Sequence, residues 1–280
     1  MRIDLHTHSA CSDGTQTPTE LMVAASSAGL DVVGLTDHDT ISGWDEAAAA
    51  VSVTGVQLVR GIELTTRDDN MSVHLLGYLF DPEAEKLRKH RQNLKNSRYE
   101  RVAKMVELIG KDYPITIEQI EERVGVGVPL GRPHIADELI RIGVIKTREE
   151  GFMGILRPGS PYYVRNYSPS TLDAISWVNE AGGKAVLAHP LGIKRGGAIK
   201  FSRFMEFKEA GLFGVEVAHR DNDRALLPEL ENLITRLDLA RFGASDYHGS
   251  GKPNLLGENT TSEEVLALLC EGSFLEVIRP

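Results

Sequence analysis

Short apolar runs alternate with helical patterns along most of the chain. Seven runs have the length and apolar content typical of buried strands, at residues 2–6, 32–36, 56–62, 73–79, 185–188, 213–217 and 241–244. Helix signals lie between them: Thr17, Pro18 and Glu20 make a capping box with a proline at the first helical position, and Gly29 ends that helix. This alternation predicts an α/β fold, and the expected parallel strands indicate a barrel.

The alternation stops between residues 81 and 168. This segment is charged and mostly helical, with helical patterns over residues 83–109, 117–124 and 135–142. Beyond it, helices are predicted at residues 171–181, 201–210, 226–237 and 263–269, with a last strand at 274–278. We therefore expect residues 1–80 and 169–280 to form the barrel, and residues 81–168 to form a helical insertion that caps a site.

Most of the chain's histidines fall at one level of the predicted barrel. The side chains at or near strand ends are His6, His8, His38, His74, His189, His219 and His248, together with Asp13, Asp37, Glu63, Glu216 and Asp246. Because the carboxyl ends of barrel strands meet at one mouth, these groups should converge there. They are too many for one open metal site and suit two or three metals that share carboxylates.

The composition limits the class of protein and the cell compartment in which such a metal site is expected. The net charge of -9 argues against a protein that binds nucleic acid through a basic surface, although metal ions can reverse the local field around a small phosphorylated substrate. Two cysteines, Cys11 and Cys270, make no disulfide framework. Arg2 and Asp4 interrupt any signal sequence, and no apolar run is long enough for a membrane span. We expect a cytoplasmic protein with no membrane contact and no stable protein partner.

Short motifs with acidic and histidine residues occur from end to end of the chain. They are Asp4-Leu5-His6-Thr7-His8, Ser12-Asp13-Gly14, Gly34-Leu35-Thr36-Asp37-His38-Asp39, Gly61-Ile62-Glu63, His74-Leu75-Leu76-Gly77-Tyr78, Gly131-Arg132-Pro133-His134, Leu187-Ala188-His189-Pro190 and Gly243-Ala244-Ser245-Asp246-Tyr247-His248-Gly249. In their residues and their order, these motifs resemble the PHP (polymerase and histidinol phosphatase) family of metal-dependent phosphoesterases.

The resemblance implies a distorted seven-stranded (β/α) barrel and three divalent metal ions as cofactors. By that resemblance, the first metal is bound by His6, His8, Glu63 and Asp246. Glu63 bridges to a second metal, which His74 and His189 also hold. Asp13, His38 and His248 hold the third. Some family members have histidine at the position of Asp13, and an aspartate there favours the harder ions Mn or Fe over Zn.

The insertion is expected to bind the substrate. Arg98 and Arg101 are three residues apart on one predicted helix face, and Arg132 and His134 follow Gly131 in an expected tight turn. Guanidinium groups suit bidentate phosphate contacts, although Arg98 and Arg101 can equally form a solvated basic face. We therefore assign substrate binding to Arg98, Arg101, Arg132 and His134. The expected catalytic residues are His134, as general acid, and the third-metal ligands Asp13, His38 and His248. Lys194 and Arg195 offer weaker candidate cations.

The resemblance also implies hydrolysis of a phosphate monoester. A standalone chain with a helical insertion is similar to the nucleotide branch of the family, which removes the 3′-phosphate of 3′,5′-bisphosphonucleotides to give a 5′-monophosphate such as AMP. The expected partner is a small phosphorylated nucleotide, or short RNA if the enzyme is a 5′-3′ exoribonuclease. Histidinol-phosphate phosphatase, C–N bond hydrolysis and a non-enzymatic nucleotide-binding module remain alternatives. C–N hydrolases usually need a bridging lysine, whereas Glu63 holds that position here.

Overall fold

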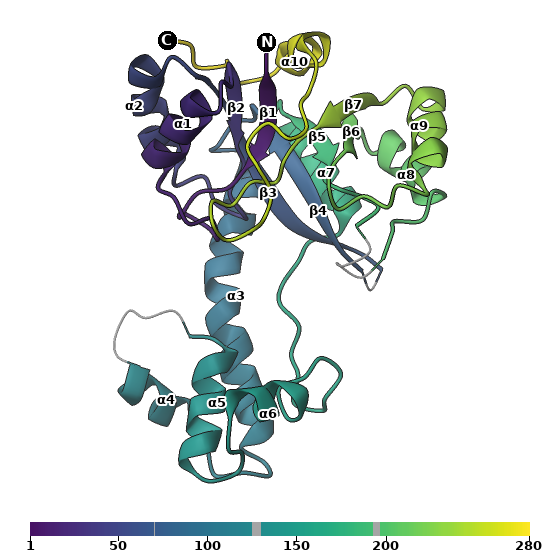
Figure 1. Ribbon diagram of the computed structural model, residues 1–280. Helices are drawn as coiled ribbons and strands as arrows, with labels where there is room; N and C mark the ends of the chain where they lie inside the picture. Colours follow the sequence, from purple (N-terminus) through teal and green to yellow (C-terminus); the bar gives the residue numbers. More distant parts are fainter. Residues whose placement is uncertain (70, 125–129, 193–196) are drawn as a thin grey trace. The chain divides into compact units, whose positions relative to one another are not determined.

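The computed structural model describes residues 1–69, 71–124, 130–192 and 197–280, without the side chains of residues 95 and 98. The strands are β1 (Ile3–Thr7), β2 (Val32–Leu35), β3 (Gln57–Asp68), β4 (Met71–Tyr78), β5 (Lys184–Leu187), β6 (Gly214–Ala218) and β7 (Ala240–Gly243) (Figure 1). The helices are α1 (Pro18–Ser27), α2 (Trp44–Thr54), α3 (Glu85–Ile109), α4 (Ile117–Val124), α5 (Arg132–Arg141), α6 (Arg148–Met153), α7 (Thr171–Glu180), α8 (Arg203–Glu209), α9 (Leu227–Arg236) and α10 (Glu263–Cys270). Contacts divide the chain into a barrel unit, residues 1–88 and 168–280, and a helical unit, residues 89–167.

The barrel unit holds one sheet whose strands stand in chain order. Within the described residues the sheet has 7 strands, ordered β1 to β7. A bridge between Thr7 and Tyr247, with the His8 amide donating to the Tyr247 carbonyl at 2.8 Å, connects β1 to the segment after β7. The edges of the sheet therefore nearly meet, and the expected distorted barrel is confirmed.

One strand departs from the expected parallel arrangement. β4 runs antiparallel to both β3 and β5, while the other neighbouring strands are parallel. β3 and β4 form a hairpin that continues to the pair Asp68 and Met71, so Glu63 lies inside β3 rather than at its end. Because β4 runs backwards, its first residues lie where the parallel strands finish. His74 therefore reaches the same mouth from the beginning of a strand.

The predicted last strand at residues 274–278 is wrong. Its bridge to β3 is isolated: Leu58 and Ile278 exchange hydrogen bonds of 2.9 and 3.0 Å, and the Phe274 and Leu275 amides donate to carbonyls outside the sheet, those of Gly182 and Leu79. β4 pairs with β3 only from Gly61 onward, so the edge of β3 at Leu58 stays available for this single pair. The tail thus covers the start of β3 without adding to the sheet.

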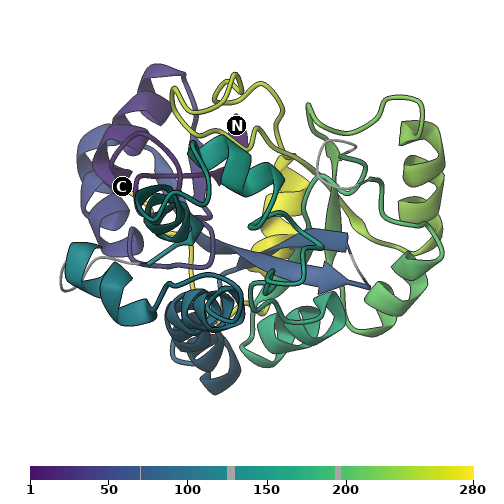
Figure 2. The ribbon, with the colours of Figure 1, turned by 90° about the horizontal axis from the view of Figure 1, so that it is seen from below.

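Two apolar clusters hold the barrel unit together. One joins the strands to α1, α2, α7, α8 and α9 and includes Leu21, Val33 and Phe204; these helices flank the sheet (Figures 1 and 2). The other joins Ile3 and other buried strand residues to Leu266 and Leu269 of α10. The strands approach closely: a Cβ added at Gly34 would lie 2.2 Å from the Leu5 carbonyl oxygen, so glycine is required there.

The helical unit has a core of its own. Its buried apolar residues include Val102, Met105 and Ile109 of α3, packed with Ile120 of α4 and Leu139 of α5. Helix α6 was not expected from the sequence, and α5 begins at Arg132 rather than at residue 135. Pro133 is in the first turn of α5, where its missing N–H costs nothing, so the expected tight turn is instead a helix start. No helix among the described residues combines the length and apolar character needed to cross a bilayer.

Candidate metal centre

Two histidines, one in β1 and one directly after it, lie at the mouth of the barrel. Asp4 pairs with Val33 and Thr7 pairs with Leu35, so β1 advances three residues while β2 advances two. This extra residue is a bulge, which shifts the alternation of side chains just before His8. His6 and His8 are both fully buried, and their Nε2 atoms lie 3.0 Å apart.

Two carboxylates, from β3 and from the segment after β7, converge on this histidine pair. The Nε2 atom of His6 lies 3.2 Å from Glu63 Oε2 and 3.4 Å from Asp246 Oδ1, and the Nε2 atom of His8 lies 3.0 and 3.3 Å from the same oxygens. A tetrahedral ion bound at about 2.0–2.1 Å would separate its ligands by about 3.4 Å. The sequence-predicted first group thus has the spacing of a compact metal site.

The other carboxylate oxygen of Glu63 faces a second set of histidines. Glu63 Oε1 lies 2.6 Å from His74 Nδ1 and 3.3 Å from His189 Nε2. His38 also approaches Glu63, with its Nδ1 3.2 Å from Oε2. The two oxygens of one carboxylate therefore face different groups of nitrogen atoms, which is the arrangement of a bridging ligand.

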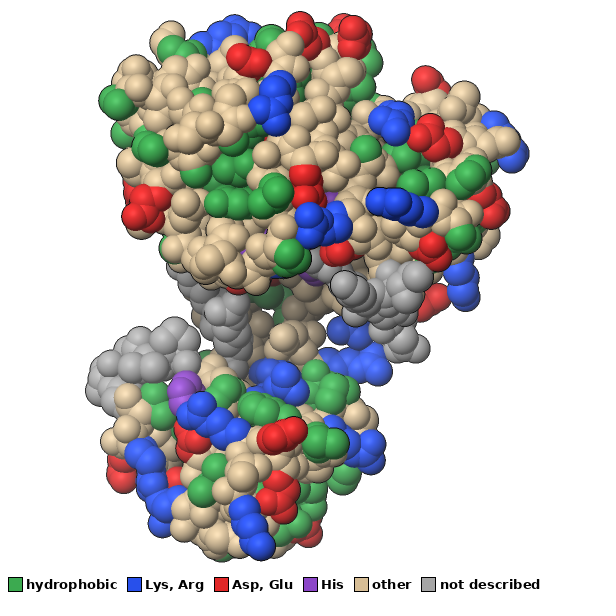
Figure 3. Space-filling model, in the orientation of Figure 1, with side chains coloured by type: hydrophobic (Ala, Val, Ile, Leu, Met, Phe, Trp, Pro, Cys, Tyr) green, Lys and Arg blue, Asp and Glu red, His purple; other side chains and the backbone are tan. Residues whose placement is uncertain are grey.

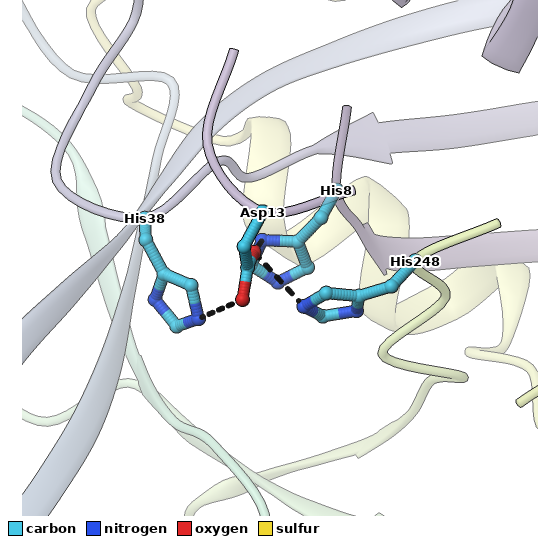
Figure 4. A group of neighbouring side chains, drawn as sticks. All are labelled: His8, Asp13, His38 and His248. Carbon is cyan, nitrogen blue, oxygen red and sulfur yellow. Dashed lines mark ion pairs between the residues drawn. The ribbon is translucent and has the colours of Figure 1, made fainter. Parts of the chain in front are cut away.

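Asp13 gathers the third set of side chains. Figure 4 shows it between His38 and His248, with His8 behind. Its carboxylate lies 3.1 Å from His248 Nε2, 3.6 Å from His8 Nδ1 and 3.8 Å from His38 Nε2. Asp13 is 54% exposed, unlike the other carboxylates of the centre. This set is therefore the most open to solvent.

The donor set fits divalent metal ions. Glu63 Oε2 and His38 Nδ1 are buried atoms that make no hydrogen bond in the described structure, although they lie 3.2 Å apart. Burying charged and polar atoms without partners is costly, and metal coordination is one way to compensate them. Mixed imidazole and carboxylate ligands suit Zn, Mn and Fe. The clusters can hold metals, and their chemistry alone does not select the ion.

Opposite charges in the centre keep its carboxylates ionised. Burial raises the pKa of Glu63, but His38 and the other neighbouring histidines outweigh it, and the pKa lies well below its usual value. The pKa of Asp246 is lowered in the same way, chiefly by His6 acting against burial. Burial lowers the pKa of His6, yet its neighbouring carboxylates, Glu216 first, raise it well above normal.

Several supporting residues hold the ligands in place. Glu216 accepts from the His189 amide at 2.9 Å and lies 2.8 Å from His6 Nδ1. Asp37 accepts from the Ser9 amide and hydroxyl and from the Ser12 hydroxyl, each at 2.7 Å, which fixes the loop before Asp13. Sequence reasoning placed Glu216 and Asp37 at this level but gave Glu216 no role.

Sequence reasoning missed Lys252 entirely. Its ammonium lies 2.8 Å from Asp246 Oδ2, so one oxygen of Asp246 faces this cation while the other faces His6 and His8. The only hint of this contact in the sequence is that Lys252 follows Asp246 by six residues.

Two of the expected ligands have an unusual backbone. His189 has φ 26° and Asp246 has φ 55°, in the region that non-glycine residues avoid. The hydrogen bond that the His189 backbone N–H donates to the Glu216 carboxylate holds it there. Such strain is maintained by surrounding contacts and clusters at functional sites.

The expected substrate-binding residues lie in the helical unit. Arg101 Nε donates to the Val164 carbonyl at 2.7 Å, and its guanidinium stacks 5.2 Å from the Tyr163 ring centroid. Arg132 lies 5.7 Å from the same ring. His134 Nδ1 accepts from the Gly131 amide at 3.1 Å. The side chain of Arg98, like Lys194 and Arg195, falls outside the described residues.

The chain is similar in sequence and structure to several known proteins. Residues 4–141 match the PHP domain. A 3′,5′-nucleoside bisphosphate phosphatase of Chromobacterium violaceum is 30% identical over 99% of this chain and 98% of its own. A 5′-3′ exoribonuclease of Haemophilus influenzae is 30% identical over 88% of this chain and 90% of its own. Among solved structures, a Bifidobacterium adolescentis protein to which metal-dependent phosphoesterase activity is ascribed is 38% identical, with a TM-score of 0.75 over 95% of this chain and 94% of that one.

Proposed function

Because the chain belongs to the PHP family and is a metal-dependent hydrolase of phosphoester bonds, we propose that it removes the 3′-phosphate of a 3′,5′-bisphosphonucleotide. The product is a 5′-monophosphate such as AMP. The relative from C. violaceum, similar over nearly its whole length, is named for this kind of substrate. The proposal assigns three divalent ions, Mn or Fe, to the centre.

The observation that carries the proposal is the position of Glu63. Its Oε2 lies 3.0 Å from His8 Nε2, and its Oε1 lies 2.6 Å from His74 Nδ1. We assign Glu63 as the bridge between a metal held with His6, His8 and Asp246 and one held with His74 and His189. Asp13, His38 and His248 are assigned to the third metal, and His8 lies against both the first and third groups.

The residues of the centre support the assignment of phosphate hydrolysis to it. Divalent ions bound at the centre supply positive charge that lowers the pKa of water and neutralises phosphate oxygens. The ionised carboxylates of Glu63 and Asp246, both fully buried, hold that charge in place. No serine or cysteine nucleophile is required.

A backbone hydrogen bond fixes the tautomer of the neutral His134 ring. Its Nδ1 accepts a hydrogen bond from the Gly131 amide, so the neutral ring carries its proton on Nε2. We assign to His134 the role of general acid to the leaving oxygen. Protonation of Nδ1, which replaces the bond from the Gly131 amide, would give the imidazolium that transfers its Nε2 proton and returns to the neutral ring. The His134→Gln variant should lose more activity on nucleotides than on an ester with an acidic leaving group, such as p-nitrophenyl phosphate, because the latter needs no proton.

Arg101 and Arg132 are the proposed contacts for the second phosphate. Burial lowers the pKa of Arg101, and the neighbouring Arg132 guanidinium lowers it further. No carboxylate among the described residues forms an ion pair with either arginine, and two adjacent unpaired guanidinium groups favour an anion. The matched variants Arg132→Lys and Arg132→Gln should raise KM for a bisphosphonucleotide, with the smaller effect for lysine.

A substrate panel tests the proposal. Metal-loaded protein is incubated with adenosine 3′,5′-bisphosphate, AMP, histidinol phosphate and short 5′-phosphorylated RNA, and phosphate and nucleotide products are measured. The bisphosphate should give the highest kcat/KM. Exoribonuclease activity is the second candidate, favoured by the similarity to the H. influenzae enzyme; preferred release of mononucleotides from RNA would support it. Turnover of no nucleotide would refute both.

A further inference from the structure

A seventh histidine lies buried beside the metal centre without a place among its ligands. His219 follows β6 directly and is only 6% exposed. Its ring centroid lies 5.0 Å from that of His189 and 6.3 Å from that of His6. Polar atoms of His6, Glu216 and His219 fall within 4.8 Å of one another. The ring therefore borders the centre itself.

The partner of Nδ1 distinguishes His219 from the proposed ligands His6 and His248. His6 Nδ1 faces the Glu216 carboxylate at 2.8 Å, and His248 Nδ1 faces the Asp246 carbonyl oxygen at 2.8 Å. Both partners are acceptors, so these rings carry a proton on Nδ1 and keep the Nε2 lone pair for a metal. His219 is opposite: the Asp221 amide donates to its Nδ1 at 3.1 Å. Its neutral ring therefore carries the proton on Nε2 and cannot offer that atom to a metal.

The Nε2–H group of His219 has no hydrogen-bond acceptor among the described residues. The nearby Glu216 carboxylate is already engaged, one oxygen with His6 and the other with the His189 amide. The turn that carries His219 is fixed, because the Asn222 side chain donates to the carbonyls of Glu216 and Val217 at 2.9 and 3.0 Å. A rigidly held, buried donor without an acceptor is costly unless a ligand supplies one.

We propose that His219 is a further catalytic residue, which donates its Nε2–H to an oxygen of the phosphate group being hydrolysed. This proposal rests on the proposed phosphoester hydrolysis at the same centre. A neutral donor of fixed direction can hold the phosphate in line for attack and stabilise the charge that grows on its oxygens. The ligands bring positive charge through the metals, whereas His219 contributes a directed hydrogen bond.

Two amide variants test the donor. Gln places an amide nitrogen near the position of Nε2, whereas Asn places an amide oxygen near Nδ1 and can accept from the Asp221 amide. If His219 acts as a donor, His219→Gln should retain most activity, and His219→Asn should lower kcat by about 10²–10³, the usual effect of removing one such donor. Both variants should keep the wild-type metal content.

Binding of inorganic phosphate to the metal-loaded protein provides a readout that needs no turnover. The affinity should fall about tenfold or more in His219→Asn and recover in His219→Gln. Wild-type affinity in His219→Asn would overturn the proposal, as would equal loss in both variants or loss of metal from either. If the wild type hydrolyses no ester of the panel but shows this phosphate pattern, the donor stands and the proposed function fails.

The tautomer can be measured in the wild type alone. In a long-range 1H–15N correlation spectrum of the Zn-loaded protein, His219 should show the proton on Nε2. A proton on Nδ1, or a shift typical of a metal-bound Nε2, would refute the assignment even if neither variant folds.

Discussion

The Nδ1 atom of His6 lies 2.8 Å from Oε1 of Glu216, and both side chains are fully buried. A carboxylate at this position holds the imidazole proton on Nδ1 and turns Nε2 toward Glu63 and Asp246, 3.2 and 3.4 Å away. The other Glu216 oxygen fixes the strained backbone of His189. One residue that need not touch a metal therefore positions two proposed ligands.

Replacing Glu216 should weaken metal binding without unfolding the protein. In Glu216→Gln the uncharged amide orients His6 less firmly and cannot accept through both of its polar atoms. Loss of such a partner typically lowers metal affinity about 10–100-fold. Metal affinity measured by competition with a chelator tests this, with the exposed Glu209→Gln variant as control. Equal affinity in the two variants would contradict the positioning role.

His38 should be essential to the third metal. His38→Ala removes the imidazole that lies between Asp13 and Glu63, at 3.8 and 3.2 Å from them. We expect one metal fewer per chain and a fall in kcat of at least about 100-fold, the scale for losing one electrostatic stabiliser. Elemental analysis and phosphate-release assays measure both quantities, with Ser42→Ala as control. Full metal-dependent activity in His38→Ala would show that the ligand assignment is wrong.

Asp13 should influence which metal activates the enzyme. Its partly exposed carboxylate is a hard oxygen ligand among imidazoles, so Asp13→His should shift the preference from Mn or Fe toward Zn. The ratio of activities after reconstitution with Zn and with Mn is the measurement. The same ratio in wild type and variant would remove Asp13 as the determinant of metal choice.

Metal binding should release protons at neutral pH. Without metal, burial lowers the pKa of His6 and His8, but neighbouring carboxylates, led by Glu216 for His6 and Asp246 for His8, raise each pKa above its usual value, so each ring holds its proton more strongly than a free imidazole does. A metal ligand must give up that proton, and apparent affinity should therefore rise with pH. Calorimetry in two buffers of different ionisation enthalpy counts the protons. Binding without proton release would contradict these pKa directions.

The positions of several proposed ligands could be predicted from the sequence, because histidine and acidic residues directly follow the apolar runs of the strands. His6, His38, His189 and Asp246 could be placed from apolar runs alone, since parallel strands finish at one mouth. The reversed direction of β4 could not be predicted, because the antiparallel hairpin of β3 and β4 has the same apolar pattern as two parallel strands. For the same reason the sequence predicts Glu63 at a strand end, whereas it lies inside β3.

The contacts that support the ligands could not be predicted, because they depend on local irregularities that the spacing of apolar residues does not show. The bulge in β1 and the register shift in β6 decide which side chains face inward; the shift in β6 falls between Glu216 and Ala218, just before His219. In the helical unit, Pro133 correctly indicated a change of structure near residue 132. Whether a turn or a helix forms there depends on how the residues after Pro133 pack, which the sequence pattern does not show. On the face in Figure 3, basic and acidic side chains are interspersed.

The most direct test of the account is 31P NMR of metal-loaded protein acting on adenosine 3′,5′-bisphosphate. The account predicts loss of the 3′-phosphate signal, with inorganic phosphate and AMP rising in equal amounts and no reaction after chelation. Loss of the 5′-phosphate instead, or hydrolysis that continues without metal, would contradict it.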